Sequence, residues 1–99
     1  MDAGIALPLF VLERYVPTPT VDGARAEAAR MRAAARVLRR EGHEVRLLAS
    51  LLVPVDETSF CVFESDSLDV VRVVSERAGL PCERIVAAVS VVPNGNGKE

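Results

Sequence analysis

The chain has 99 residues, 49% hydrophobic and 26% charged, a balance that is typical of one folded domain and excludes a disordered chain. Twelve basic against 14 acidic residues leave a net charge of -2, so no broad positive field is available to bind nucleic acid. The first residues carry no positive stretch, and no apolar run approaches the roughly 18 residues that cross a bilayer. We therefore expect a cytoplasmic protein with no membrane partner.

The first half of the chain predicts a strand, a helix and a second strand. Residues 8–16 are rich in strand-forming side chains and end at a Pro-Thr-Pro-Thr segment that cannot extend a β-ladder. Asp22 is expected to cap a helix over residues 23–41, because apolar residues recur there every three or four positions until Gly42. A nearly continuous apolar run then predicts a strand over residues 43–53.

The second half predicts a hairpin partner, a helix and a last strand. A polar turn precedes a third strand over residues 59–64, so the second and third strands are expected to form a hairpin. Ser65 or Ser67 is positioned to cap a helix that runs to about Ala78. A final β-branched strand is predicted over residues 84–92.

The order β, α, β, β, α, β predicts an α+β domain of ferredoxin-like topology. Such a domain has a four-stranded antiparallel sheet of order 4-1-3-2 with both helices on one face, and we expect its first and third strands to be parallel neighbours. The predicted domain covers residues 8–93, after an N-terminal extension over 1–7 and before a disordered tail over 94–99.

The predicted sheet is apolar on both faces. In the second strand the odd positions from Val45 to Val53 are apolar, while Leu48 and Leu52 place apolar side chains on the other face. Two helices cover only one face, so the other is expected to pair with a second copy in a dimeric α/β-barrel-type arrangement. The alternative is a lone domain with an apolar ligand cleft.

Two glutamates are the candidate catalytic or metal-binding groups. Glu13 and Glu64 come near the ends of the first and third strands, so as parallel neighbours they are expected to emerge at the same end of the sheet. Two close carboxylates can share a cation, or share a proton so that one acts as a catalytic base. The alternative is that Glu13 pairs with Arg14, Arg84 or an arginine of the first helix at the sheet edge.

Three further side chains are candidates for binding. Tyr15 is expected on the same face as Glu13, and Ser50 could reach in from the second strand to give an apolar cleft a polar, ligand-binding end. Alternatively Tyr15 is an interface aromatic and Ser50 a satisfied hydroxyl. His43 is the only histidine, and its best functional use is as a metal ligand supplied across a dimer; otherwise it is a surface residue near a helix end. Cys61 is expected in the core.

Three blocks spread over the chain resemble one protein family. They are Val11-Leu12-Glu13-Arg14-Tyr15, Phe60-Cys61-Val62-Phe63-Glu64 and Ala78-Gly79-Leu80-Pro81-Cys82-Glu83-Arg84-Ile85. In type and spacing they resemble small bacterial nickel-binding-protein-like domains. The resemblance implies a ferredoxin-like fold, oligomers and, in some members, binding of nickel or a similar divalent metal. Where such members carry a His-Ser-Tyr-like triplet in the second strand, this chain has Ala49-Ser50-Leu51.

Three functions follow as hypotheses. The first is a small ligand-binding protein that takes up a divalent metal such as nickel as a homodimer. The second is a cofactor-free enzyme, of isomerase, cyclase or monooxygenase type, in which Glu13 or Glu64 is the base for a hydrophobic metabolite. The third is a non-catalytic interaction module in which both sheet faces are simply buried.

Overall fold

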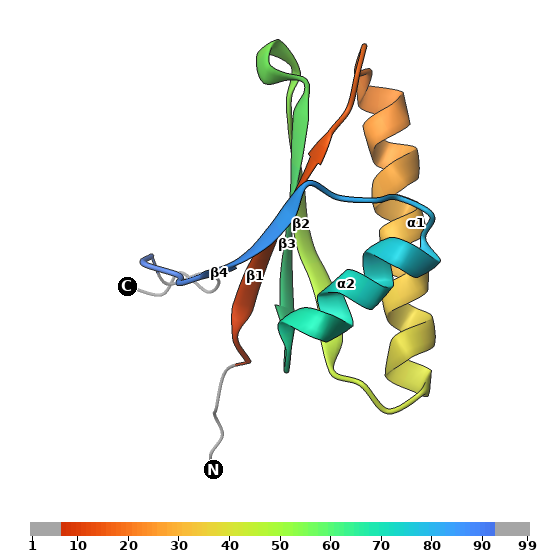
Figure 1. Cartoon of the computed structure of the whole chain (residues 1–99), viewed down its shortest axis with the longest axis vertical. Helices are drawn as coiled ribbons and strands as arrows, with labels where there is room; N and C mark the ends of the chain where they lie inside the picture. Colours follow the sequence, from red (N-terminus) through yellow and green to blue (C-terminus); the bar gives the residue numbers. More distant parts are fainter. Residues whose placement is uncertain (1–6, 93–99) are drawn as a thin grey trace.

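The computed structural model describes residues 7–92, so the predicted tail over 94–99 and most of the predicted extension over 1–7 lie outside the described residues. The elements are β1 (Leu9–Tyr15), α1 (Val21–Arg40), β2 (Val45–Val53), the short 3-10 turn η1 (Pro54–Asp56), β3 (Thr58–Ser65), α2 (Leu68–Arg77) and β4 (Arg84–Ala88). Figure 1 shows both helices on one side of the sheet and the opposite side bare. Within residues 7–92, no helix combines the length and apolar character that a membrane span requires.

The sheet has the order β2-β3-β1-β4, and every neighbouring pair is antiparallel. This confirms the predicted strand order and the ferredoxin-like α+β fold. The expectation that the first and third strands run parallel was wrong, because β1 pairs with β3 antiparallel, from Leu9 opposite Glu64 to Tyr15 opposite Thr58. The physical reason is the connectivity: the crossover through α1 makes β1 and β2 run in the same direction, and the hairpin turns β3 back between them, so β3 runs opposite to both.

The regular alternation predicted for the second strand is interrupted. Val45 and Leu47 are buried under the helices, but the register shifts between Leu47 and Ala49. Beyond that bulge Ser50 lies opposite Cys61, a core residue on the helix-covered face. A bulge inserts one residue and so exchanges the faces that the following side chains occupy. The even positions, not the odd ones, therefore face the helices in the second half of β2.

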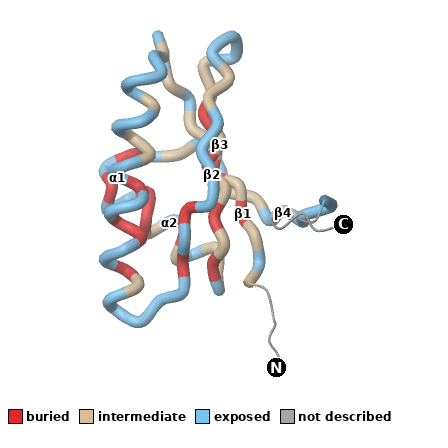
Figure 2. The backbone as a smooth tube through the Cα atoms, turned by 180° about the vertical axis from the view of Figure 1, so that it is seen from behind, coloured by how far each residue is buried: buried red, intermediate tan, exposed pale blue. Residues whose placement is uncertain are grey.

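The core lies between the helices and the covered face of the sheet. Figure 2 shows the buried positions of α1 turned toward the strands and its exposed positions turned outward. Met31, Ala35 and Leu38 are buried on α1, which confirms the predicted apolar stripe. Their partners come from the strands and α2, and the fully buried ones with the largest side chains are Phe63, Leu12, Val45, Val71 and Val74.

Side-chain caps set the first turns of both helices. The hydroxyl of Ser67 accepts a hydrogen bond from the Val70 amide at 3.2 Å, which confirms one of the two predicted caps. On α1 the cap is Thr20, whose Oγ1 accepts from the Gly23 amide at 2.9 Å, and not Asp22 as predicted. Asp22 lies instead inside the first turn, where its charge favours the positive end of the helix dipole.

The last strand is shorter than predicted, ending at Ala88 instead of residue 92. Ala88 pairs with Leu9, which is the first residue of β1. A β-ladder needs a partner strand, so pairing stops where β1 begins. The β-branched residues that follow, Val89, Val91 and Val92, are exposed.

We expect Gly79→Ala to destabilise the domain more than Gly42→Ala. Both glycines have positive φ, +71° and +101°, where a Cβ costs about 1–2 kcal/mol. At Gly79 the added Cβ would also meet the Arg30 guanidinium at 3.0 Å, whereas at Gly42 nothing lies within 4 Å. Urea unfolding of the two variants measures the difference. Equal losses would show that Arg30 moves aside without cost.

Candidate functional site

One face of the sheet is covered by the two helices and the other face has no helix over it (Figure 1). Alternation along the paired strands places on this helix-free face Leu9, Val11, Leu51, Phe60, Val62, Val86 and Ala88. Most are half-buried by their neighbours in the sheet, whereas Leu51 is 60% exposed. Contiguous apolar surface of this kind is typical of a contact with another protein surface.

The predicted glutamate pair does not form within one chain. Glu13 lies opposite Phe60, whereas Glu64 lies opposite Leu9, so the two carboxylates occupy opposite ends of β1 on the helix-free face. Each has an arginine partner: Glu13 accepts from Arg84 Nε at 2.9 Å, and Glu64 lies 3.7 Å from Arg46 Nε. The alternative expectation, that Glu13 pairs with an arginine at the sheet edge, is the one that the structure shows.

Tyr15 and Ser50 lie on opposite faces of the sheet, so they do not form one end of a single cleft. Tyr15 is exposed and donates its hydroxyl to Glu57 Oε1 at 3.1 Å. This hydrogen bond, with the charge of Glu57, raises the pKa of Tyr15. The other oxygen of Glu57 accepts from the Thr18 amide at 3.1 Å, so Tyr15 belongs to a contact that ties the β2–β3 turn to the end of β1.

His43 lies in the connection between α1 and β2, outside the paired strands that carry the two glutamates. It borders an open groove of about 250 Å³ on the helix side, together with Asp69 and Arg77. Nowhere in residues 7–92 do three His, Cys, Asp or Glu side chains gather in a group that could hold a metal ion. The described part of one chain therefore does not by itself fit nickel, which prefers several donors that include imidazole.

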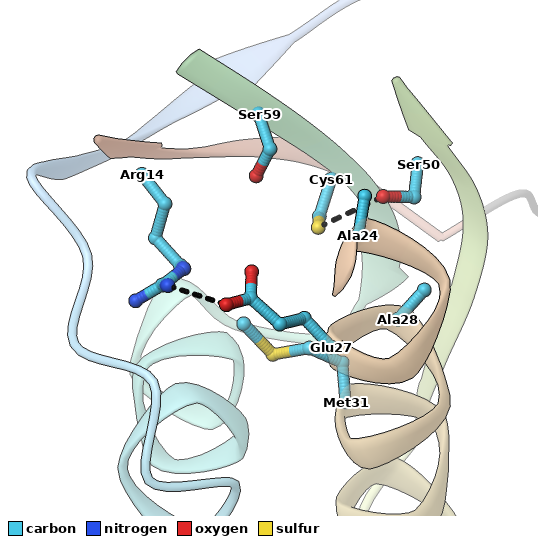
Figure 3. A pocket seen from close by; sticks show the side chains of 8 residues that line it. All are labelled: Arg14, Ala24, Glu27, Ala28, Met31, Ser50, Ser59 and Cys61. Atoms are coloured by element: carbon cyan, nitrogen blue, oxygen red, sulfur yellow. Dashed lines mark hydrogen bonds and ion pairs between the residues drawn. The ribbon is translucent and has the colours of Figure 1, made fainter. Parts of the chain in front are cut away.

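A small cavity lies between α1 and the sheet, and we call it the chamber. Its volume is about 10 Å³, enough for about one water molecule. As Figure 3 shows, its lining residues are Arg14, Ala24, Glu27, Ala28, Met31, Ser50, Ser59 and Cys61. A carboxylate, a guanidinium, a thiol and two hydroxyls thus converge under the helix, beside an otherwise apolar core.

Arg14 is the central group of the chamber. Its side chain is 12% exposed, donates from Nη1 to the Pro81 carbonyl at 2.8 Å, and donates from Nη2 to Glu27 Oε2 at 3.0 Å. Its Nε is buried and has no hydrogen-bond partner among the described residues. Leaving a buried donor unpaired costs about 1–3 kcal/mol, and more for a charged group. The chamber therefore has room, and a charged donor, for one more acceptor.

Cys61 borders the same chamber but is not set up as a nucleophile. Burial raises the pKa of its thiol, although a contact with the Ser50 hydroxyl at 3.6 Å acts in the opposite direction. A nucleophilic cysteine needs a thiolate, which positive and exposed surroundings favour and burial opposes. Its buried position in the core agrees with the expectation from sequence.

The raised pKa of Cys61 predicts a stability that falls at alkaline pH. The unfolded chain loses this proton above about pH 8.5, whereas the folded chain keeps it, so the unfolded state binds fewer protons and the free energy of unfolding decreases as pH rises. Urea unfolding between about pH 8 and about pH 10 should show this decline. We expect Cys61→Ala to make it shallower, with Cys82→Ala as the control. An unchanged slope in Cys61→Ala would contradict the raised pKa.

Arg14 and Glu27 were not among the candidates from sequence, although a signal was present. Arg14 shares the strand face of Phe10 and Leu12, which are buried, so alternation alone assigns a charge to the covered face. Glu27 falls between Ala24 and Ala28 on the sheet-facing side of α1. A charged residue on a core face is rare unless it has a partner. Two opposite charges at core-facing positions therefore indicate a buried ion pair.

Comparisons with known proteins agree with this fold and identify the family. The crystal structure of SCO4226 from Streptomyces coelicolor A3(2) superposes with a TM-score of 0.70, at 19% identity, over 85% of this chain and 99% of the other. At that identity the likeness shows the fold alone. No curated protein matches the chain. Residues 10–87 match the family described as nickel responsive protein SCO4226-like. The chain therefore belongs to the SCO4226-like family of nickel-responsive proteins.

Proposed function

We propose that this protein is a small ligand-binding protein that works as a homodimer and takes up a divalent metal such as nickel between its copies. The observation that carries the proposal is the helix-free face, which is apolar at its centre and carries one carboxylate toward each end, Glu13 and Glu64. The family's nickel response supports the choice of metal. Closed two-fold pairing is the commonest way to bury such a face.

Two-fold pairing also explains why the carboxylates lie apart in one chain. A two-fold axis that runs across the strands reverses the strand direction of the second copy. The end of β1 that carries Glu13 would then face the end of the partner's sheet that carries Glu64 of the partner subunit. Two such mixed pairs arise per dimer. His43 is exposed, so its imidazole is available to add a nitrogen donor from a neighbouring copy.

An enzyme that uses Glu13 or Glu64 as a base has less support. Both carboxylates are ion-paired with arginines on a half-exposed face. A general base must be free to take a proton from the substrate, and an ion pair with an arginine opposes this. Binding is therefore the function that the geometry favours.

The first test is association of the protein in solution. We expect light scattering to give a dimer for the wild type, and a monomer for Val62→Asp, because the new charge falls at the centre of the helix-free face. Val89→Asp is the matched control, since Val89 is exposed beyond β4 and outside the paired strands. A wild-type monomer, or a dimeric Val62→Asp, would overturn the proposed pairing.

The second test is calorimetric titration with nickel chloride. Binding is expected in the wild type, weaker binding in Glu13→Gln, Glu64→Gln and His43→Ala, and none in the monomeric Val62→Asp. Metal bound equally well by the monomer would contradict a site that is shared between copies. Absence of nickel binding in the wild type would overturn the metal part of the proposal and leave the dimer standing.

A further inference from the structure

A groove lies beside the chamber, between the first turns of α1 and the edge strand β2. The groove has a volume of about 230 Å³ and is lined by Val21, Ala24, Arg25, Ala28, Ser50 and Leu52. Three of these residues, Ala24, Ala28 and Ser50, also line the chamber. The two spaces therefore adjoin, and the inner one is bounded by the Arg14 guanidinium and the Glu27 carboxylate.

The groove exists because the side chains that face it from the helix and the sheet are small. Farther along α1, Met31 and Leu38 are buried against the sheet, but the earlier sheet-facing positions are Ala24 and Ala28. On β2 the bulge turns Ser50 toward the same space. The gap results from residue size and register, and it continues inward to Arg14 and Glu27.

The inner end defines what a ligand must offer. Arg14 Nε is a buried donor without an acceptor among the described residues. Glu27 uses Oε2 for Arg14, and Figure 3 shows its other oxygen turned toward Ser59 and Cys61. The charges of Arg14 and Glu27 already neutralise each other. A charged ligand would therefore lose its hydration in the chamber without gaining an unpaired opposite charge there. A neutral hydroxyl meets both needs, because its oxygen accepts from Nε while its proton is donated to the carboxylate.

We propose that the groove and the chamber together bind a small neutral molecule with an apolar body and a hydroxyl head, such as a simple phenol. The apolar body lies between Val21, Ala24 and Leu52 in the groove, and the hydroxyl occupies the chamber. The groove supplies the room that the chamber alone lacks. This site is on the helix-covered side of the sheet, separate from the helix-free face, and does not depend on dimer formation.

The test follows the side-chain Nε–H signal of Arg14 by nitrogen-15 NMR, assigned by its loss in Arg14→Lys. We expect p-cresol to shift this signal in a saturable manner. Toluene, which has the same ring and methyl group without the hydroxyl, is expected to leave it in place. A chamber that holds water only would show no p-cresol shift, and that result overturns the proposal, as would equal shifts from both compounds.

A pair of matched variants locates the site independently of Arg14. Ala24→Leu fills the groove and is expected to weaken p-cresol binding at least about ten-fold. Ala29→Leu makes the same change on the exposed side of α1 and is expected to leave the affinity unchanged. Backbone amide spectra verify that both variants are folded. Unaltered affinity in folded Ala24→Leu would show that p-cresol binds elsewhere and would overturn the proposal.

Discussion

Phe63→Ala is expected to lower the free energy of unfolding by about 3–5 kcal/mol, the typical cost of truncating a buried phenylalanine. Phe63 is fully buried on the covered face of β3, where it is among the largest side chains of the core. Removing its ring takes away apolar burial and leaves a cavity that the rigid sheet closes only in part. Urea unfolding followed by circular dichroism measures the loss.

Phe60→Ala is the matched control for this prediction. Phe60 lies on the same strand but on the helix-free face, opposite Glu13 and Leu51. We expect its truncation to cost the folded monomer about 1 kcal/mol, and to weaken the proposed dimer instead. The monomer contribution is isolated in the Val62→Asp background. Equal losses for the two phenylalanines there would contradict the assignment of faces along β3.

Arg14→Met is expected to lower the free energy of unfolding by about 2–4 kcal/mol. The change leaves the Glu27 carboxylate under the helix without its counter-charge and the Pro81 carbonyl without its donor. Breaking a buried ion pair typically costs about 3–5 kcal/mol, and the figure is reduced here because Glu27 remains 27% exposed. Methionine keeps much of the apolar stem, so lost packing contributes little.

A double-mutant cycle separates the charge effect from packing. The double variant Arg14→Met/Glu27→Met should be more stable than Arg14→Met alone, because no charge is then left unpaired. The exposed ion pair of Arg77 with Glu41 is the comparison, and Arg77→Met should have little effect. If the double variant is no more stable than Arg14→Met, the Arg14–Glu27 interaction is not the source of the stabilisation.

The sequence was sufficient to predict the order of the elements and their approximate limits. Hydrophobic periodicity, caps and prolines are local signals, and they correctly placed α1 and α2 and the hairpin between β2 and β3. Strand direction is not local. It depends on how the connections route the chain, and the prediction went wrong there although the strand order was right, with the result that Glu13 and Glu64 were expected to meet.

The candidate site was less predictable, because it depends on register. Strict alternation along β2 assigns Ser50 to the face opposite Val45, and this assignment is wrong because the bulge between Leu47 and Ala49 returns Ser50 to the helix-covered face. Ser50 therefore lines the chamber together with Ser59 and Cys61, whereas Tyr15 lies on the helix-free face. A one-residue bulge leaves little trace in composition, so no pattern in the sequence would have placed these side chains together.

The bulge at Leu48 also protects the edge of the sheet. In this sheet β2 has one unpaired side, and it is a nine-residue apolar strand of the kind that recruits further strands into aggregates. Recruitment requires an evenly spaced row of free amide and carbonyl groups. The bulge divides that row into two short segments that are out of phase, and Pro54 follows where the strand ends. The irregularity that shapes the chamber on one side thus opposes the pairing of further strands along β2 on the other.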